Sequence, residues 1–101
     1  MNIIISSPKY DLAGKDKDYA VEKFSHLERI HNLDTLEARF SEANNKISCE
    51  VKMLAPRAEP IVLSLDAEHA REVIDLLIEK CERQLRRLKE KKEDKRYVSG
   101  Q

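Results

Sequence analysis

Hydrophobic residues follow two different periods along the chain, and the change of period separates strands from helices. Alternation of apolar and polar residues predicts a half-buried strand, whereas apolar residues three and four positions apart predict a helix with one buried face. Strands are predicted over residues 1–6, 35–41, 47–53 and 61–65. The helical period runs from Lys15 to Ile30 and from Ala67 to Lys92. The predicted order of elements is therefore βαβββα.

The connections between these segments indicate how the strands pair. Asn44-Asn45 is a hairpin signal, since Asn tolerates positive φ. The stretch 55–60 holds two prolines and is predicted as a loop, and Asp66 is placed to cap the second helix. Three consecutive strands joined by short connections are expected to form an antiparallel meander.

The distribution of polar residues over the strands predicts a layered fold. Each strand has one apolar face and one mostly polar face, so both helices are expected on the same side of the sheet. The sequence therefore predicts an α+β, two-layer βαβββα domain, with two helices packed on one face of a four-stranded sheet. The other face is left to water or to a partner, and it carries Thr35, Glu37, Arg39, Ser48, Glu50, Lys52 and Ser64.

The chain of 101 residues and 11.7 kDa has the size of one domain. We expect this domain to span residues 1–92 and to be followed by a polar, disordered tail over residues 93–101. No apolar run is long enough for a membrane span, and the N-terminus has no secretory h-region. The expected location is therefore cytoplasmic.

Charge is balanced over the whole chain but unevenly distributed along it. Residues 1–79 carry 10 Lys and Arg against 15 Asp and Glu, whereas residues 80–101 carry 9 against 4. At about 100° per residue, Lys80, Arg83, Arg87 and Lys91 fall on one flank of the second helix, and most of its carboxylates fall on the other. Such a sorted helix end suits oriented docking on a large anionic surface.

This basic flank has two interpretations. Glu79–Arg83 and Glu82–Arg86 are i,i+4 pairs with Glu N-terminal, which favours a simple solvated helix stabilised by its own ion pairs. Lys80, Arg87 and Lys91 have no such partner on their own flank, which favours contacts with phosphate. The pattern alone leaves both interpretations open.

Sequence motifs for catalysis or metal binding are absent. Cys49 and Cys81 occupy apolar positions without CxxC spacing, so they are expected to be small buried thiols. The three histidines form no close ligand pair, with His31 expected at a helix end and His26 and His69 at the surface. We therefore expect a protein that is not an enzyme and that uses no cofactor or metal.

Two stretches resemble a known family. Residues 70–89, AREVIDLLIEKCERQLRRLK, resemble the second helix of the ribosome hibernation-promoting factor and ribosome-associated inhibitor family, also called the sigma-54 modulation protein family, whose pattern is AID.LIDKL.RQL.KHK. Residues 19–28, YAVEKFSHLE, resemble its first helix, YV..KF.KLE. The resemblance covers nearly all of residues 1–92, and the family fold has the same βαβββα order. The resemblance is to the short form of the family, and this is the form we expect.

The resemblance implies a translation inhibitor that acts under stress or in stationary phase. Members bind the small ribosomal subunit in the channel for mRNA and tRNA, so the implied partner is ribosomal RNA, with no membrane and no small-molecule substrate, and the free protein is expected to be monomeric. The implied RNA-binding residues are Lys23, Lys80, Arg83, Arg86, Arg87, Lys89 and Lys91. Two alternatives stay open, namely a non-ribosomal protein-interaction module and a double-stranded RNA-binding module, whose two helices also pack on a sheet.

Overall fold

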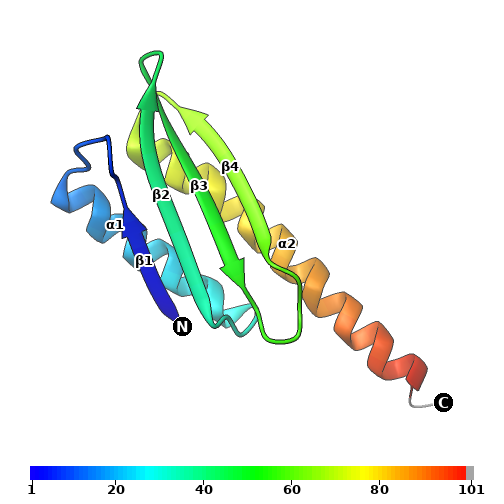
Figure 1. The fold of residues 1–101 in the computed structure, drawn as a ribbon. Coiled ribbons are helices and arrows are strands. Elements are labelled where there is room, and N and C mark those ends of the chain that lie inside the picture. Colours follow the sequence, from blue (N-terminus) through cyan, green and yellow to red (C-terminus); the bar gives the residue numbers. More distant parts are fainter. Residues whose placement is uncertain (100–101) are drawn as a thin grey trace.

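The computed structural model describes the backbone of residues 1–99 and the side chains of residues 1–90. Its elements follow one another along the chain as shown in Figure 1. They are β1 (Asn2–Ser6), α1 (Gly14–Ser25), the short 3₁₀ helix η1 (His26–Arg29), β2 (Thr35–Ala43), β3 (Lys46–Leu54), β4 (Ile61–Ala67) and α2 (Ala70–Ser99). The predicted α+β class and the order βαβββα are confirmed.

The strands lie in the sheet in the order in which they occur in the sequence, β1-β2-β3-β4. β2 pairs antiparallel with β3, and β3 with β4, so the predicted meander is confirmed. β1 pairs parallel with β2, with Ile3 opposite Leu36. A parallel pair needs a crossover connection, and here α1 with η1 supplies it.

The turn between β2 and β3 is made by the two asparagines that the sequence indicated. Asn44 and Asn45 have φ values of 53° and 61°, the left-handed conformation that a two-residue type I′ hairpin requires. Its twist matches that of the flanking strands, and Ala43 therefore pairs directly with Lys46. The turn sets the register that decides which strand residues face the helices.

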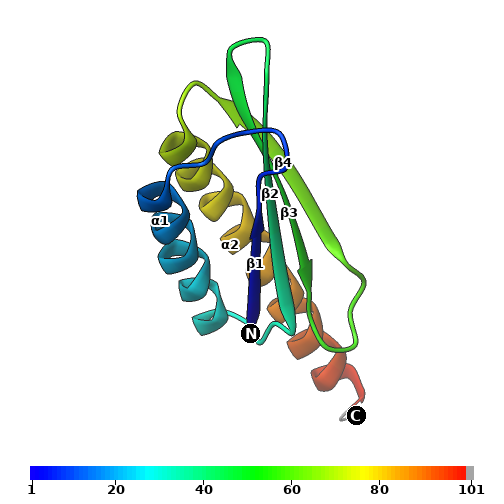
Figure 2. The same cartoon turned by 60° about the vertical axis from the view of Figure 1, so that its left-hand side comes forward.

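Both helices cover the same face of the sheet, as predicted (Figure 2). The core lies between these two layers, because alternate residues of the strands point towards the helices. Its largest fully buried side chains include Phe24 and Leu27 from the α1 side, Phe40 from β2, and Leu77 and Leu85 from α2. The opposite face of the sheet is exposed.

Three predicted boundaries need correction. Asp66 does not cap α2, because β4 continues to Ala67, which pairs with Ile47, and α2 begins only at Ala70. The backbone N–H of Glu68 instead donates to the Glu72 carboxylate at 3.2 Å. The first helix ends as an α-helix at Ser25, and its last turn tightens into η1.

α2 continues to Ser99, beyond the end that was predicted at Lys92. The side chains of residues 91–99 and all of residues 100–101 lie outside the described residues. The division into a domain over residues 1–92 and a disordered tail over 93–101 therefore stays a prediction.

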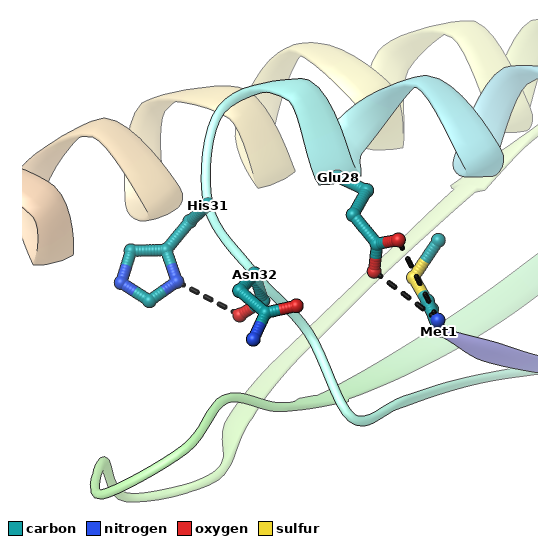
Figure 3. A network of polar contacts seen from close by, with 4 residues as sticks. All are labelled: Met1, Glu28, His31 and Asn32. Carbon is teal, nitrogen blue, oxygen red and sulfur yellow. Dashed lines mark hydrogen bonds and ion pairs between the residues drawn. The ribbon is translucent and has the colours of Figure 1, made fainter.

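Two polar contacts lie at η1 and directly after it (Figure 3). The Met1 ammonium lies 3.3 Å from Glu28 Oε2, which links the start of β1 to η1. Nδ1 of His31 lies 2.8 Å from the carbonyl oxygen of Asn32. His31 thus interacts with the backbone at the end of the helix, where the sequence placed it, while His26 and His69 are exposed as expected.

The two cysteines are buried free thiols, as predicted. Burial raises the pKa of Cys49 to about 12, and the neighbouring Cys81 contributes to this shift. Burial likewise raises the pKa of Cys81 to about 12. Both groups are therefore uncharged and unreactive at neutral pH. No described helix is long and apolar enough to cross a membrane.

Candidate nucleic-acid interface

The two helices run side by side in the same direction, with α1 and η1 alongside the first two thirds of α2 (Figures 1 and 2). We call the solvent-facing surface where α1 and η1 meet α2 the helix seam. Its first contact joins α1 to α2, where the Arg71 Nε donates to Asp16 Oδ1 at 3.0 Å. This contact shows that the flank of α2 with Arg71 faces α1.

Tyr19 is the centre of the paired end of the seam. Its hydroxyl donates to Asp75 Oδ1 at 2.5 Å. The Arg71 guanidinium lies 4.8 Å from the centre of its ring, and the Lys23 ammonium lies 5.4 Å from it. The hydrogen bond to Asp75, with desolvation second, raises the pKa of Tyr19 above its ordinary value of 10.0. The carboxylates and cations at this end therefore largely satisfy one another.

The other end of the seam is a shallow hollow between η1 and α2. It is lined by Arg29, Ile30, Arg86, Lys89 and Glu90, and we call it the cationic hollow. Within the side chains described, Arg29 and Lys89 have no acidic partner within ion-pair distance. Arg86 lies 3.9 Å from Glu82, and these side chains are 63% and 42% exposed, so this pair is weak. Three cations thus converge from two helices.

The opposite flank of α2 carries a second basic surface. At about 100° per residue, Lys80, Arg83 and Arg87 lie across the buried stripe from Arg71 and Asp75, and thus on the flank turned away from α1. We call these three exposed residues the outer ridge. The predicted Glu79–Arg83 pair is not formed among the described side chains, whereas the Glu82–Arg86 pair is. The ridge cations therefore remain available to a partner.

The RNA-binding residues implied by the sequence are thus not one surface. Arg86 and Lys89 share the cationic hollow, the outer ridge is separate, and Lys23 belongs to the paired end, half-buried beside Tyr19. The side chain of Lys91 lies outside the described residues.

Arg29 was missed by the sequence analysis. It follows directly after the stretch that resembles the family's first helix, and it reaches the hollow only because η1 runs alongside α2. Its signal in the sequence was a basic residue at the end of the first helical period. Which basic residues of α2 it would meet depends on the parallel alignment of the helices, which periodicity does not give.

In residues 1–90, no three or more His, Cys, Asp or Glu side chains gather in an arrangement that could hold a metal ion. What the surface provides is guanidinium and ammonium groups on rigid helices, and these groups bind phosphate oxygens by charge-assisted hydrogen bonds.

Comparison with known proteins identifies the family of this chain. The family model described as Sigma 54 modulation protein / S30EA ribosomal protein matches residues 3–93. The chain belongs to this family. The match includes the whole helix seam and the outer ridge. The family description names a modulation protein and a ribosomal protein rather than an enzyme.

Two solved structures share the fold of this S30EA family member. A ribosomal subunit interface protein from Coxiella burnetii superposes with a TM-score of 0.78 and 20% identity, over 88% of this chain and 98% of that one. The N-terminal domain of Protein Y from Thermus thermophilus gives a TM-score of 0.77 and 20% identity, over 87% and 99%. At this identity the likeness establishes the fold alone. A comparison with curated proteins gives no match.

Proposed function

We propose that this protein is a ribosome hibernation factor that binds the small ribosomal subunit in the channel for mRNA and tRNA and thereby inhibits translation under stress or in stationary phase. The observation that carries the proposal is the excess of exposed, weakly paired or unpaired cations on η1 and on the described part of α2, in a chain whose family is described as ribosomal. The proposed partner is ribosomal RNA, and the proposed mechanism is occupancy without catalysis.

The cationic hollow is suited to a phosphate group. Arg29 and Arg86 present planar guanidinium groups that can hold two phosphate oxygens at once, and Lys89 adds a point charge. The two helices hold the backbone of these cations in place, while the exposed side chains themselves would be ordered by the phosphate, at a cost in side-chain entropy. Such contacts fix the orientation of a protein on RNA without reading its sequence.

The outer ridge would contact a different stretch of RNA backbone. Lys80, Arg83 and Arg87 lie on the far flank of α2, and a phosphate in the hollow would not reach them. Held on two flanks, α2 would lie between two strands of a folded RNA, as in a channel with RNA walls. A helix in that position excludes mRNA and tRNA by its volume.

Sedimentation of purified small subunits through sucrose tests this proposal. The protein is expected to pellet with the subunits at low salt and to be released as salt rises, with a slope of about 0.7–0.9 per phosphate contact in a log–log plot. A hollow variant, with Arg29, Arg86 and Lys89 changed to Glu, is expected to lose binding and most of that salt dependence. Subunits filled beforehand with mRNA and tRNA are expected not to bind the protein.

The control carries the same change in charge at exposed positions away from α2, with Lys9, Lys17 and Lys46 changed to Glu. It is expected to bind nearly as well as the natural chain. Equal loss of binding in the control would show that only net charge matters. Binding to free duplex RNA as tight as to subunits, or no pelleting at low salt, would overturn the proposal.

A further inference from the structure

The exposed face of the sheet carries a square of four charges at its centre. The register places Glu37 of β2 opposite Lys52 of β3, and Arg39 opposite Glu50 in the neighbouring row. The sign of the charge therefore alternates along each strand as well as across the pair. None of these side chains forms an ion pair with any of the described residues.

An apolar side chain lies at each end of the row that contains Glu37 and Lys52. Ile4 of β1 is the neighbour of Glu37, and Val62 of β4 is the neighbour of Lys52. Ile4 is 43% exposed and Val62 is 54% exposed, which makes them the two most exposed of the large apolar side chains described. The face is hollowed here, and the hollow is lined by the four charged side chains together with Ile4, Ser6, Ser7 and Pro8.

We propose that this face binds a second copy of the same chain, with a twofold axis that lies between the two sheets, parallel to the strands, and passes between β2 and β3. Rotation about this axis exchanges the positions of β2 and β3 across the interface. Glu37 then faces Lys52 of the second copy, and Arg39 faces its Glu50. β1 and β4 are exchanged in the same way, so Val62 of one copy meets Ile4 of the other beside the hollow.

This self-complementarity is what favours a second copy over other partners. A twofold interface brings the same patch together from both subunits, so the patch must be complementary to itself. This face meets that requirement, because its charges face opposite charges and its apolar ends face each other. An RNA backbone would gain Arg39 and Lys52 but would be repelled by Glu37 and Glu50. A uniformly acidic or basic protein would likewise meet two repulsive charges.

The association is expected to be weak and sensitive to salt. Exposed ion pairs contribute little each, and salt screens them. Ile4 and Val62 provide only a small apolar area, and sheets packed face to face are rotated by about 30°, which favours the central charges over the edges. Dimers are therefore expected at high protein concentration and low ionic strength, in contrast to the monomer that the sequence analysis expected.

Sedimentation equilibrium over a range of protein concentrations tests the proposal. The natural chain is expected to show a rising average mass at low salt, and the rise is expected to shrink at high salt. Glu37→Lys places like charges opposite each other twice in the dimer and is expected to leave only monomer. Glu59→Lys makes the same charge change on the exposed loop before β4 and is expected to dimerise normally.

A variant with all four charges inverted gives the sharper test. Exchanging the signs of Glu37, Arg39, Glu50 and Lys52 preserves every pairing between two identical copies, so this variant is expected to dimerise with itself. It is expected not to pair with the natural chain, because every facing pair would then be of like sign. Native mass spectrometry of a mixture of the two chains measures the fraction of mixed dimers directly.

The proposal is overturned if the natural chain stays monomeric at all concentrations at low salt. It is also overturned if Glu37→Lys dimerises as the natural chain does, or if the inverted variant mixes freely with it. This inference is separate from ribosome binding, which uses the other side of the molecule. A Glu37→Lys variant that keeps its mass distribution but no longer pellets with ribosomes would assign the face to the ribosome instead.

Discussion

The two ends of the helix seam are made by the same pair of helices, yet their charges are arranged in opposite ways. At the start of α1, Asp16 pairs with Arg71 and Tyr19 with Asp75, so acids and cations alternate between the helices. At η1, Arg29 faces Arg86 and Lys89, and cations meet cations. The helices are held beside each other at one end by their own contacts. Among the described side chains, the other end gathers three cations with only Glu90 beside them and Glu82 weakly paired to Arg86, so positive charge is in excess there.

Because of this difference, one end of the helix seam serves mainly the stability of the fold and the other end mainly the binding of a partner. The paired end contributes hydrogen bonds to folding and leaves little charge for a partner. The cationic end contributes repulsion to folding, which is tolerated because Leu27 and Leu85 are buried beneath that part of the helices. Local conflicts with folding are expected at functional sites. The contrast can be broken or sharpened by the three changes below, whose effects on stability decrease in order.

The largest effect is expected from the buried layer that supports both ends. Phe24 is fully buried on α1, between Tyr19 and Arg29 in the sequence. Phe24→Ala removes most of a large apolar side chain and leaves a cavity, with an expected loss of about 3–5 kcal/mol in the free energy of unfolding. Urea denaturation followed by circular dichroism measures this loss, and ribosome binding is expected to fall with the folded fraction.

The matched control is Val21→Ala on the exposed side of the same helix. Val21 is 38% exposed, so less apolar surface is lost and no closed cavity forms. Its expected cost is below about 1 kcal/mol. Equal costs for the two substitutions would show that α1 is not packed through Phe24.

A smaller effect is expected at the paired end. Tyr19→Phe removes the hydroxyl that donates to Asp75 but keeps the ring beside Arg71 and Lys23. The expected loss is about 0.5–1 kcal/mol at neutral pH, below the roughly 1.5–3 kcal/mol typical of a hydrogen bond to a charged group, because the contact is exposed. Urea denaturation measures it, and binding to small subunits is expected to change little.

The pH dependence of the same pair gives an independent check. The pKa of Tyr19 is raised in the folded protein above its ordinary value of 10.0, mainly because the hydroxyl donates to Asp75. The folded state thus favours the protonated phenol, and this stabilisation is complete below pH 10 and is lost as pH rises through the raised pKa. The stability difference between the natural chain and Tyr19→Phe is therefore expected to shrink above pH 10. A difference that grows there would contradict the assigned hydrogen bond.

The fold was predictable because its signals are local. Alternation in β2 and β3, the Asn44-Asn45 turn and the 3.6-residue period of α2 each act over a few residues, and all indicate the same layers. Asp66 was wrongly predicted to cap α2, because an Asp that directly follows an apolar–polar alternation can either end the strand and cap a helix or continue the strand. Its neighbour Ala67 pairs with Ile47, far away in the sequence, and that tertiary contact decided the boundary.

The site was only partly predictable because it depends on how two helices are aligned. Periodicity placed Arg86 and Lys89 on α2, but it could not show which residue of the first helix they would meet. The alignment of α1 with α2 is set by the long-range packing contacts of both helices in the buried core, and it brings Asp16 to Arg71 and Arg29 into the hollow. The same contacts turn the outer ridge away from α1.

The smallest effect on stability is expected where the repulsion between the cations of the cationic hollow is reduced. Lys89→Gln removes one of three like charges in the cationic hollow, and Lys and Gln have similar helix propensities. Because like-charge neighbours on helices destabilise by about 0.2–0.5 kcal/mol, the free energy of unfolding is expected to rise by about that amount at low salt. The rise is expected to disappear at high salt, where the repulsion is already screened.

Lys80→Gln on the outer ridge is the matched control, since it removes the same charge from the same helix away from Arg29 and Arg86. Lys80 has one like-charged neighbour on its own helix, Arg83 at i+3, so its unfolding free energy is expected to rise by less than that of Lys89→Gln, which also relieves the repulsion from Arg29. Each variant is expected to lower the salt slope of ribosome binding by about one contact. Thermal unfolding at two salt concentrations, with binding measured in parallel, distinguishes the two positions. If both variants gain the same stability, net charge alone is responsible and the hollow is not a place of converging cations. If Lys89→Gln gains more, then the repulsion that weakens the fold and the charge that binds the ribosome are located at the same residues.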